Sequence, residues 1–297
     1  MNIVDFLNLL VAAVLLAGVY AAMSVGMTII YGVLKIVNLA HAGFLMLGAY
    51  FVYELYTRIH IDPLLGVVLA FPLFFFIGIA LYWLLIRPIP RSDQPTLSSL
   101  LLLFGLWLVL QNEGYLIWGN ADRAILTSRT FSAFEIGPII FPTIRLVVFG
   151  VALASVAALE FVLHSTWFGR AVRALMQNSD ASRIAGVNVD RTAQISFGIG
   201  IAFAGAAGGL LAMMYSFTPD FGGSFLLRAF VIIVLGGLES FAGVAIGALI
   251  LALVETFSIL VIPSGYQPAI AFSLLVLALV ILPDGVAGLW KKRQLWT

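Results

Sequence analysis

Residues 144–215 are the most informative stretch of the sequence, because two long apolar segments enclose one polar segment. The first apolar segment, Ile144–Leu163, reads IRLVVFGVALASVAALEFVL, and the last, Ala193–Tyr215, reads AQISFGIGIAFAGAAGGLLAMMY. Between them lies His164–Thr192, HSTWFGRAVRALMQNSDASRIAGVNVDRT. A helix needs about 20 apolar residues to cross the hydrocarbon of a bilayer. Each apolar segment therefore predicts a transmembrane helix, and the polar segment is a loop at one membrane face.

This polar loop carries a positive charge and signals for short helices. Four arginines face two aspartates, namely Arg170, Arg173, Arg183 and Arg191 against Asp180 and Asp190. Basic residues resist translocation, so the loop is expected in the cytoplasm. Trp167–Met176 predicts a basic amphipathic helix. Asn178 or Ser179 is expected to cap a second helix over 180–185, which Gly186 ends, and Asn188 is expected to cap the next span.

Short helices held between two spans can pass force from a soluble partner to the membrane domain. We therefore predict a coupling loop over residues 164–192. Its candidate contact residues are Gly169, Arg170, Arg173, Asn178, Asp180, Ala181, Arg183 and Gly186. The alternative is an ordinary basic loop that only sets the topology.

Composition indicates the broad class of protein. Hydrophobic residues make up 62% of the 297 residues and charged residues only 10%, with a mean hydropathy of +1.11. Soluble domains have about 25% charged residues. We therefore predict an all-α, polytopic membrane helix bundle. The absence of cysteine excludes disulfides and cysteine-based chemistry, and the net charge of +1 gives no sign of nucleic-acid binding.

Hydropathy predicts eight full spans and one short, broken segment. The N-terminus lacks the basic residues of a cleavable signal and is interpreted as a retained first span. The short segment, Arg228–Leu238, is followed by the helix-breaking run from Gly236 to Gly243. The full spans are Leu9–Gly32, Ile36–Tyr56, Leu64–Ile86, Leu97–Trp118, Ile144–Leu163, Ala193–Tyr215, Ala242–Ile262 and Gln267–Leu282.

The distribution of lysine and arginine predicts the orientation. With the N-terminus outside, the majority of basic residues lie inside: Lys35, Arg87, Arg91, Arg170, Arg173, Arg183, Arg191 and Lys291–Arg293. The minority lie outside: Arg58, Arg123, Arg129, Arg145 and Arg228. The N-terminus is therefore expected outside and the C-terminus in the cytoplasm.

Two polar breaks in the apolar pattern suggest an internal, inverted repeat. Ala42-Gly43 followed by Gly48-Ala49 matches Ala242-Gly243 followed by Gly247-Ala248, although chance similarity is the alternative. Interrupted spans in corresponding halves point towards a transport path. The two breaks are expected to approach each other near the membrane interior. The candidate path residues are Asn38, His41, Ala42, Gly43, Gly236, Gly237, Glu239 and Ser240.

Other roles compete for the polar residues inside the spans. Asn38 could cap a helix that begins near Leu39, with His41 in its first turn, so both residues fit packing as well as solute contact. Glu255 lies in the middle of a span, where an ionised carboxylate is costly and needs a partner. It is either a proton relay or a buried group that joins two helices, and we favour the second interpretation.

The sequence contains no recognisable active site. None of the lysines follows the glycine spacing of a phosphate-binding loop, so the chain cannot use ATP by itself. Its histidines, His41, His60 and His164, are far apart and lack metal-ligand spacing. A membrane enzyme is therefore a remote alternative, and we expect neither a metal nor a cofactor.

Three segments carry a resemblance to a known family. YGVLKIVNLAHAGFLMLGAY, FGRAVRALMQNSDASRIAGVNVDR and VIIVLGGLESFAGVAIGALILALVE occur in the order and approximate spacing of LivH-type permease subunits of branched-chain amino acid ABC transporters. The resemblance runs from about Ala21 to the C-terminus. Two positions depart from the family: Ala42-Gly43 replaces Gly-Glu, and Glu239-Ser240 replaces Gly-Ser. These departures leave the substrate open, since related permeases carry urea or short amides.

The resemblance implies an assembly and a function. The chain would be a single permease domain over residues 1–297, a multi-pass protein of the bacterial inner membrane. It would pair with a second permease subunit as a heterodimer, with two cytoplasmic ATPase subunits that use ATP and a periplasmic substrate-binding protein. Gly169–Arg191 matches the stretch that contacts the ATPases. The alternative is an ion-coupled secondary transporter or channel for a small polar solute.

Overall fold

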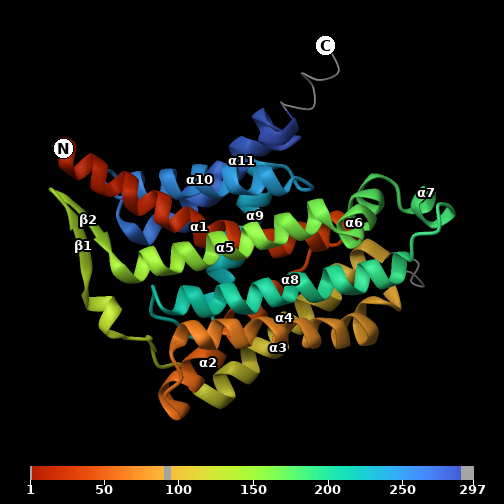
Figure 1. The fold of residues 1–297 in the computed structure, drawn as a ribbon, viewed down its shortest axis with the longest axis horizontal. Helices are drawn as coiled ribbons and strands as arrows, with labels where there is room; N and C mark the ends of the chain where they lie inside the picture. Colours follow the sequence, from red (N-terminus) through yellow and green to blue (C-terminus); the bar gives the residue numbers. More distant parts are fainter. Residues whose placement is uncertain (1, 90–94, 289–297) are drawn as a thin grey trace.

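The computed structural model describes residues 2–89 and 95–288, and most helices run along the long axis of the molecule (Figure 1). The membrane-length helices are joined by short connections and by two polar segments. The elements, in chain order, are α1 (Ile3–Leu34), α2 (His41–Ile59), α3 (Pro63–Leu81), the π-helical segment η1 (Tyr82–Ile86), α4 (Pro95–Trp118), the 3-10 turn η3 (Ser128–Phe131), β1 (Ala133–Ile136), β2 (Ile139–Pro142), α5 (Thr143–Ser165), α6 (Trp167–Gln177), α7 (Ser179–Ile184), α8 (Val189–Ala212), α9 (Phe221–Gly236), α10 (Phe241–Ser258), the 3-10 turn η4 (Ser264–Tyr266) and α11 (Gln267–Ile281).

Seven helices of the described chain are long and apolar enough to cross a membrane, which confirms a multi-pass helix bundle. They are α1, α3 with η1, α4, α5, α8, α10 and the segment that begins with α11. The second predicted span, Ile36–Tyr56, is wrong in its bounds, and the helix found there, α2, is not among these seven. Residues 35–40 are not in a helix, and α2 carries the polar residues His41, Glu54 and Arg58, which lower its hydropathy.

The short, broken segment is also confirmed, although it begins earlier than its apolar run suggests. The helix α9 has 16 residues and starts at Phe221 rather than at Arg228. Arg228 therefore lies in the middle of a helix. Its predicted place in an outside segment is wrong, because α9 already begins at Phe221 and the Arg228 side chain is buried in the bundle.

Glycines bring α8 into backbone contact with α1 and α2 at the centre of the bundle. A Cβ atom placed on Gly208 would lie 1.9 Å from the carbonyl oxygen of Leu45 in α2. One placed on Gly200 would lie 2.6 Å from the carbonyl oxygen of Gly26 in α1. Small residues permit such close helix packing in lipid. The helix α8 is correspondingly the most buried of the seven spans.

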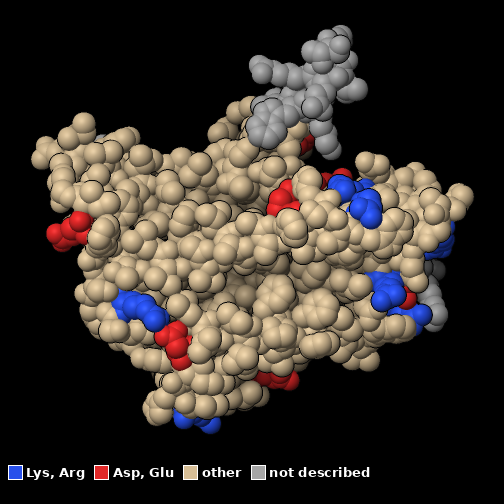
Figure 2. Space-filling view, viewed as in Figure 1, with Lys and Arg blue, Asp and Glu red and all other residues tan. Residues whose placement is uncertain are grey.

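The two polar segments lie at opposite ends of this bundle (Figure 1). The antiparallel hairpin of β1 and β2 binds the first turns of α1, because Asn8 Oδ1 accepts a hydrogen bond of 2.9 Å from the Ile140 amide. At the other end of α1, Gly32 faces Met176 of α6. We call these the hairpin end and the loop end. Between them, much of the face in Figure 2 is uncharged, and several basic side chains gather at the loop end.

Candidate transport path and coupling surface

The loop between α5 and α8 folds into the two predicted short helices. Thr166 caps α6, and its Oγ1 atom accepts from the Gly169 amide at 3.2 Å. Asn178 caps α7 by accepting from the Ala181 amide at 2.9 Å. Gly186 follows α7 with a positive φ of 84°, and Asn188 caps α8 by accepting from Arg191 at 2.9 Å. The predicted caps Asn178 and Asn188 and the predicted stop at Gly186 are confirmed.

The helix α6 is anchored to the end of α5, while the turn of α7 is exposed. Gly169 is buried, and a Cβ atom there would lie 1.8 Å from the Leu163 carbonyl oxygen. Arg173 donates a hydrogen bond to the same oxygen. By contrast, Asp180 and Ala181 are exposed. The loop therefore has a fixed base and a free outer surface, as a contact with a soluble partner requires.

This surface also carries two exposed apolar side chains that the sequence did not suggest as contact residues. Trp167 is 70% exposed and Ile184 is 89% exposed. Both lie in the polar stretch 164–192, where the average hydropathy is low and single apolar residues do not stand out. Arg170 lies over the Trp167 ring, with its Cζ atom 5.3 Å from the ring centre, and Arg170 and Arg183 are themselves exposed. An exposed tryptophan with an arginine is a typical composition of protein–protein contacts.

The first break turns the chain back into the bundle. Lys35 ends α1 in the left-handed region, with a φ of 57°. The helix α2 then starts at His41, whose Nε2 atom lies 3.0 Å from the Met23 carbonyl oxygen in α1. Met23 is 11 residues before the end of α1, or about 16 Å at about 1.5 Å per residue. The chain of residues 35–40 therefore runs back beside α1, and α2 starts in the interior.

The predicted capping role of Asn38 is wrong. The N-cap of α2 is Ala40, without a side-chain hydrogen bond. Asn38 and His41 are fully buried, as is Ala42, and Gly43 is buried against Leu110. Neither side-chain polar atom of Asn38 has a hydrogen-bond partner. The chain starts α2 two residues later than the pattern suggested, because residues 35–40 first have to return into the bundle.

The second break joins α9 to α10 at the loop end. Gly237 has a φ of 100°, a conformation that favours glycine. Ser240 caps α10 by accepting from the Gly243 amide at 3.0 Å, and a Cβ atom on Gly236 would lie 2.4 Å from the backbone of Gly243. The break lines a cavity of about 330 Å³. Glu239, in the same turn, is paired with Lys35.

The expectation that the two breaks meet in the membrane interior is wrong. Lys35 and Glu239 meet at the loop end, but Lys35 precedes the candidate path segment. Ala42 instead lies beside Gly222, which is in the first turn of α9. A Cβ atom placed on Gly222 would be only 1.9 Å from the Ala42 carbonyl oxygen. Gly236 lies 14 residues further along the same helix, or about 21 Å. That these segments line a transport path stays a prediction.

A buried ion pair connects three helices nearer the hairpin end. Arg228 Nε in α9 donates to Glu255 Oε1 in α10 at 2.8 Å, and the Tyr20 hydroxyl in α1 donates to Glu255 Oε2 at 2.5 Å. The side chains of Arg228 and Glu255 are only 10% and 3% exposed. The partner that Glu255 requires in the membrane is therefore Arg228. The sequence signal for this pair was an arginine and a glutamate that each lie inside an apolar segment. The two residues are 27 positions apart on different helices, so no spacing within one helix connects them.

The same ion pair lines a cavity of about 440 Å³ that the sequence did not suggest. One wall follows α1, and the others come from α5, the connection before α9, and the helices α9, α10 and α11. The lining residues include Leu9, Leu16, Tyr20, Arg145, Tyr215, Phe221, Arg228 and Glu255. We call this space the hairpin-end cavity.

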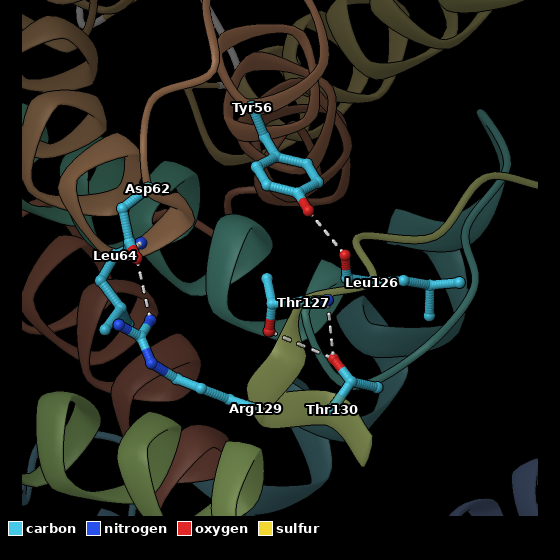
Figure 3. A network of polar contacts seen from close by, with 7 residues as sticks. All are labelled: Tyr56, Asp62, Leu64, Leu126, Thr127, Arg129 and Thr130. Atoms are coloured by element: carbon cyan, nitrogen blue, oxygen red, sulfur yellow. Dashed lines mark hydrogen bonds and ion pairs between the residues drawn. The ribbon is translucent and has the colours of Figure 1, made fainter. Parts of the chain in front are cut away.

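The connection between α4 and α5 is tied to the rim of the bundle at the hairpin end (Figure 3). Asp62 caps α3 by accepting from the Leu64 amide at 2.9 Å, and its second oxygen accepts from Arg129 at 3.0 Å. The Tyr56 hydroxyl of α2 donates to the Leu126 carbonyl at 2.7 Å. These bonds hold the connection on α2 and α3, so it forms a fixed outer surface.

The fold, its seven spans and its exposed short helices define a multi-pass membrane permease, and comparisons agree. The family model described as "Branched-chain amino acid transport system / permease component" matches residues 9–282. The chain belongs to this family. None of the solved structures matches it. Within the described residues, no group of three His, Asp or Glu side chains is placed to hold a metal ion.

Relatives with a known role are similar along nearly the whole chain. The high-affinity branched-chain amino acid transport system permease protein LivH of Escherichia coli K12 is 30% identical, over 95% of this chain and 96% of its own length. The corresponding protein BraD of Pseudomonas aeruginosa is 27% identical, over 97% of both chains. The ribose import permease protein RbsC of Escherichia coli K12 is 30% identical, over 89% of this chain and 82% of its own.

Proposed function

We propose that this chain is the membrane subunit of a binding-protein-dependent ABC importer for branched-chain or other small amino acids. A separate ATPase would drive it through α6 and α7. The observation that carries the proposal is the loop end, where an anchored α6 and an exposed α7 present Trp167, Ile184 and charged residues to the outside. The names of LivH and BraD support the substrate class.

The proposed assembly follows from the same family. It contains a second permease subunit as a heterodimer, two ATPase subunits at the loop end and a periplasmic binding protein at the hairpin end. The whole chain, residues 1–297, acts as one permease domain in the bacterial inner membrane, with residues 164–192 as the coupling loop. ATP is used by the partner subunits, and this chain binds no cofactor and catalyses no reaction.

The contrasting function is an ion-coupled transporter in which Glu255 carries a proton. The geometry disfavours it, because Arg228 and Tyr20 occupy both carboxylate oxygens of Glu255. The assembled complex should be reconstituted with ATP and without an ion gradient, and uptake of L-leucine measured. ATP-dependent uptake supports the proposal. Uptake by this chain alone under a proton gradient would overturn it.

The orientation can be measured independently, since the chain contains no cysteine. Single cysteines at Ala181 in α7 and at Ser132 beside the hairpin are both at exposed positions. In intact cells, a membrane-impermeant thiol reagent should label Ser132→Cys and leave Ala181→Cys unlabelled until the membrane is opened. The reverse labelling would place the N-terminus in the cytoplasm.

Cysteines also test the candidate path at the two breaks. Ser240 is half-buried beside a cavity, whereas Ala42 is fully buried. Ser240→Cys should react with a water-soluble thiol reagent, and Ala42→Cys should react only when nucleotide and binding protein open the bundle. If neither position reacts in any nucleotide state, the breaks are structural hinges and the path lies elsewhere.

A further inference from the structure

The hairpin-end cavity is lined by an arginine without a partner and by an apolar wall. Arg145, in the first turn of α5, is half-buried and lines the cavity. The described residues offer its side chain neither an ion pair nor a hydrogen bond. A partly desolvated guanidinium without a partner is costly, and a carboxylate is the planar group that it binds best.

The net charge of the cavity points to the same chemistry. Arg228 and Glu255 neutralise each other at its base, with both carboxylate oxygens of Glu255 already engaged. Arg145 is therefore the charge that remains, and the cavity has a positive formal charge. This positive charge favours the binding of an anionic group.

The remaining wall is suited to an aliphatic group. Leu9, Ala12, Leu16 and Tyr20 line the cavity at spacings of three and four residues, which place them on one face of α1. The aromatic residues Phe221 and Phe225 of α9 line it as well. Its volume of about 440 Å³ falls within the range of about 300–1,000 Å³ that is typical of small-molecule sites.

We propose that the hairpin-end cavity binds a small carboxylate with an aliphatic tail, with Arg145 holding the carboxylate and the α1 face contacting the tail. This inference rests on the proposed function, because such a solute is what the importer would receive at this end. It places solute binding at the hairpin end, away from both sequence breaks. Arg145 is then a specificity-determining residue within the permease itself.

The test measures binding by the full chain in phosphatidylcholine nanodiscs, without its partners. The probes are 4-methylvalerate, which has the carboxylate and the tail, and 4-methylvaleramide, which lacks the charge. Saturation-transfer NMR should show weak binding of the acid and about tenfold weaker binding of the amide, since one charge-assisted hydrogen-bonded contact is lost. Arg145→Gln should weaken binding of the acid by a similar factor, and Arg145→Lys should retain part of it.

Arg58→Gln is the matched control, because Arg58 is an exposed arginine on α2 that does not line the cavity. It should bind the acid like the unchanged chain. Equal binding of acid and amide, or an unaffected Arg145→Gln, would overturn the proposal. A phospholipid that native mass spectrometry finds on the chain and that Arg145→Gln loses, with no binding of the acid, would also overturn it.

Uptake separates this inference from the proposed function. With ATP and saturating binding protein, Arg145→Gln should slow L-leucine uptake about tenfold, whereas the matched control Arg58→Gln should import L-leucine like the unchanged complex. If the unchanged complex imports L-leucine but the chain binds no acid in nanodiscs, the cavity proposal fails and the importer function stands. If the acid binds but the complex imports neither L-leucine nor another small amino acid with ATP, the importer function fails.

Discussion

The two ends of the bundle place their charged side chains in opposite surroundings. At the loop end, Arg170, Asp180 and Arg183 are exposed, and none forms an ion pair with another described residue. Towards the hairpin end, Arg228 and Glu255 are buried and bonded to each other. Exposed charges contribute little to folding and are available to a partner, whereas each member of a buried pair needs the other to compensate its charge. The two ends should therefore respond differently to substitution.

The largest effect is expected from breaking the buried pair. Glu255→Leu leaves the Arg228 guanidinium buried without its carboxylate, and removing one partner of such a pair costs about 3–5 kcal/mol. Denaturant unfolding of the purified chain in detergent should show this loss. The double variant Glu255→Leu with Arg228→Met should recover most of it, because no unpaired charge remains. A double variant as unstable as the single one would contradict the comparison.

A smaller effect is expected at the backbone contact between α8 and α2, in the centre of the bundle between the two ends. Gly208→Ala forces α8 away from α2, because its Cβ atom would meet the Leu45 carbonyl oxygen. Overpacking of this kind costs about 1–3 kcal/mol. Gly105→Ala in α4 is the matched control, since no atom lies within 4 Å of its Cβ position, and it should be neutral or slightly stabilising. Equal unfolding midpoints for both variants would show that the helices separate freely.

The half-exposed pair at the loop end should matter less. Lys35 and Glu239 have side chains that are 48% and 40% exposed, so solvent screens them and the pair contributes about 1 kcal/mol at most. Lys35→Met and Glu239→Gln should each shift the unfolding midpoint slightly, and the shift should shrink at high salt. A loss as large as that of Glu255→Leu would place this pair in the same class as the buried one.

The smallest effect on stability, with the largest on coupling, is expected in α7. Asp180→Lys and Ala181→Trp change exposed side chains, so the unfolding free energy should move by less than about 0.5 kcal/mol. In the assembled complex, the amount of ATP hydrolysed per solute should nevertheless rise. Glu135→Lys, an exposed charge reversal in β1, should leave that ratio unchanged. Normal transport by both α7 variants would remove the coupling role from the loop.

Local signals in the sequence account for the elements that were predicted well. Seven spans follow from hydropathy, because lipid selects apolar runs of sufficient length. The α6–α7 loop follows from Asn178, Gly186 and Asn188, because capping bonds join residues only a few positions apart. The fold class and the position of α7 in the chain therefore follow from local patterns alone.

The features that failed or were missed depend on distant contacts. The return of residues 35–40 beside α1 displaces the start of α2 to His41, which no local pattern records. The pairing of Arg228 with Glu255 was missed because only the packing of α9 against α10 brings the two side chains together.

The membrane class, seven of the spans, the short loop helices and the family to which the chain belongs all follow from the amino-acid sequence. These features depend on composition, on hydrogen bonds between residues close in sequence, and on the order of the family's motifs along the chain. The depth of α2, the pairing of Arg228 with Glu255 and the cavity beside Arg145 become visible only in the folded chain. Each of these arises where helices far apart in the chain meet, and helix packing alone sets which of their side chains face one another.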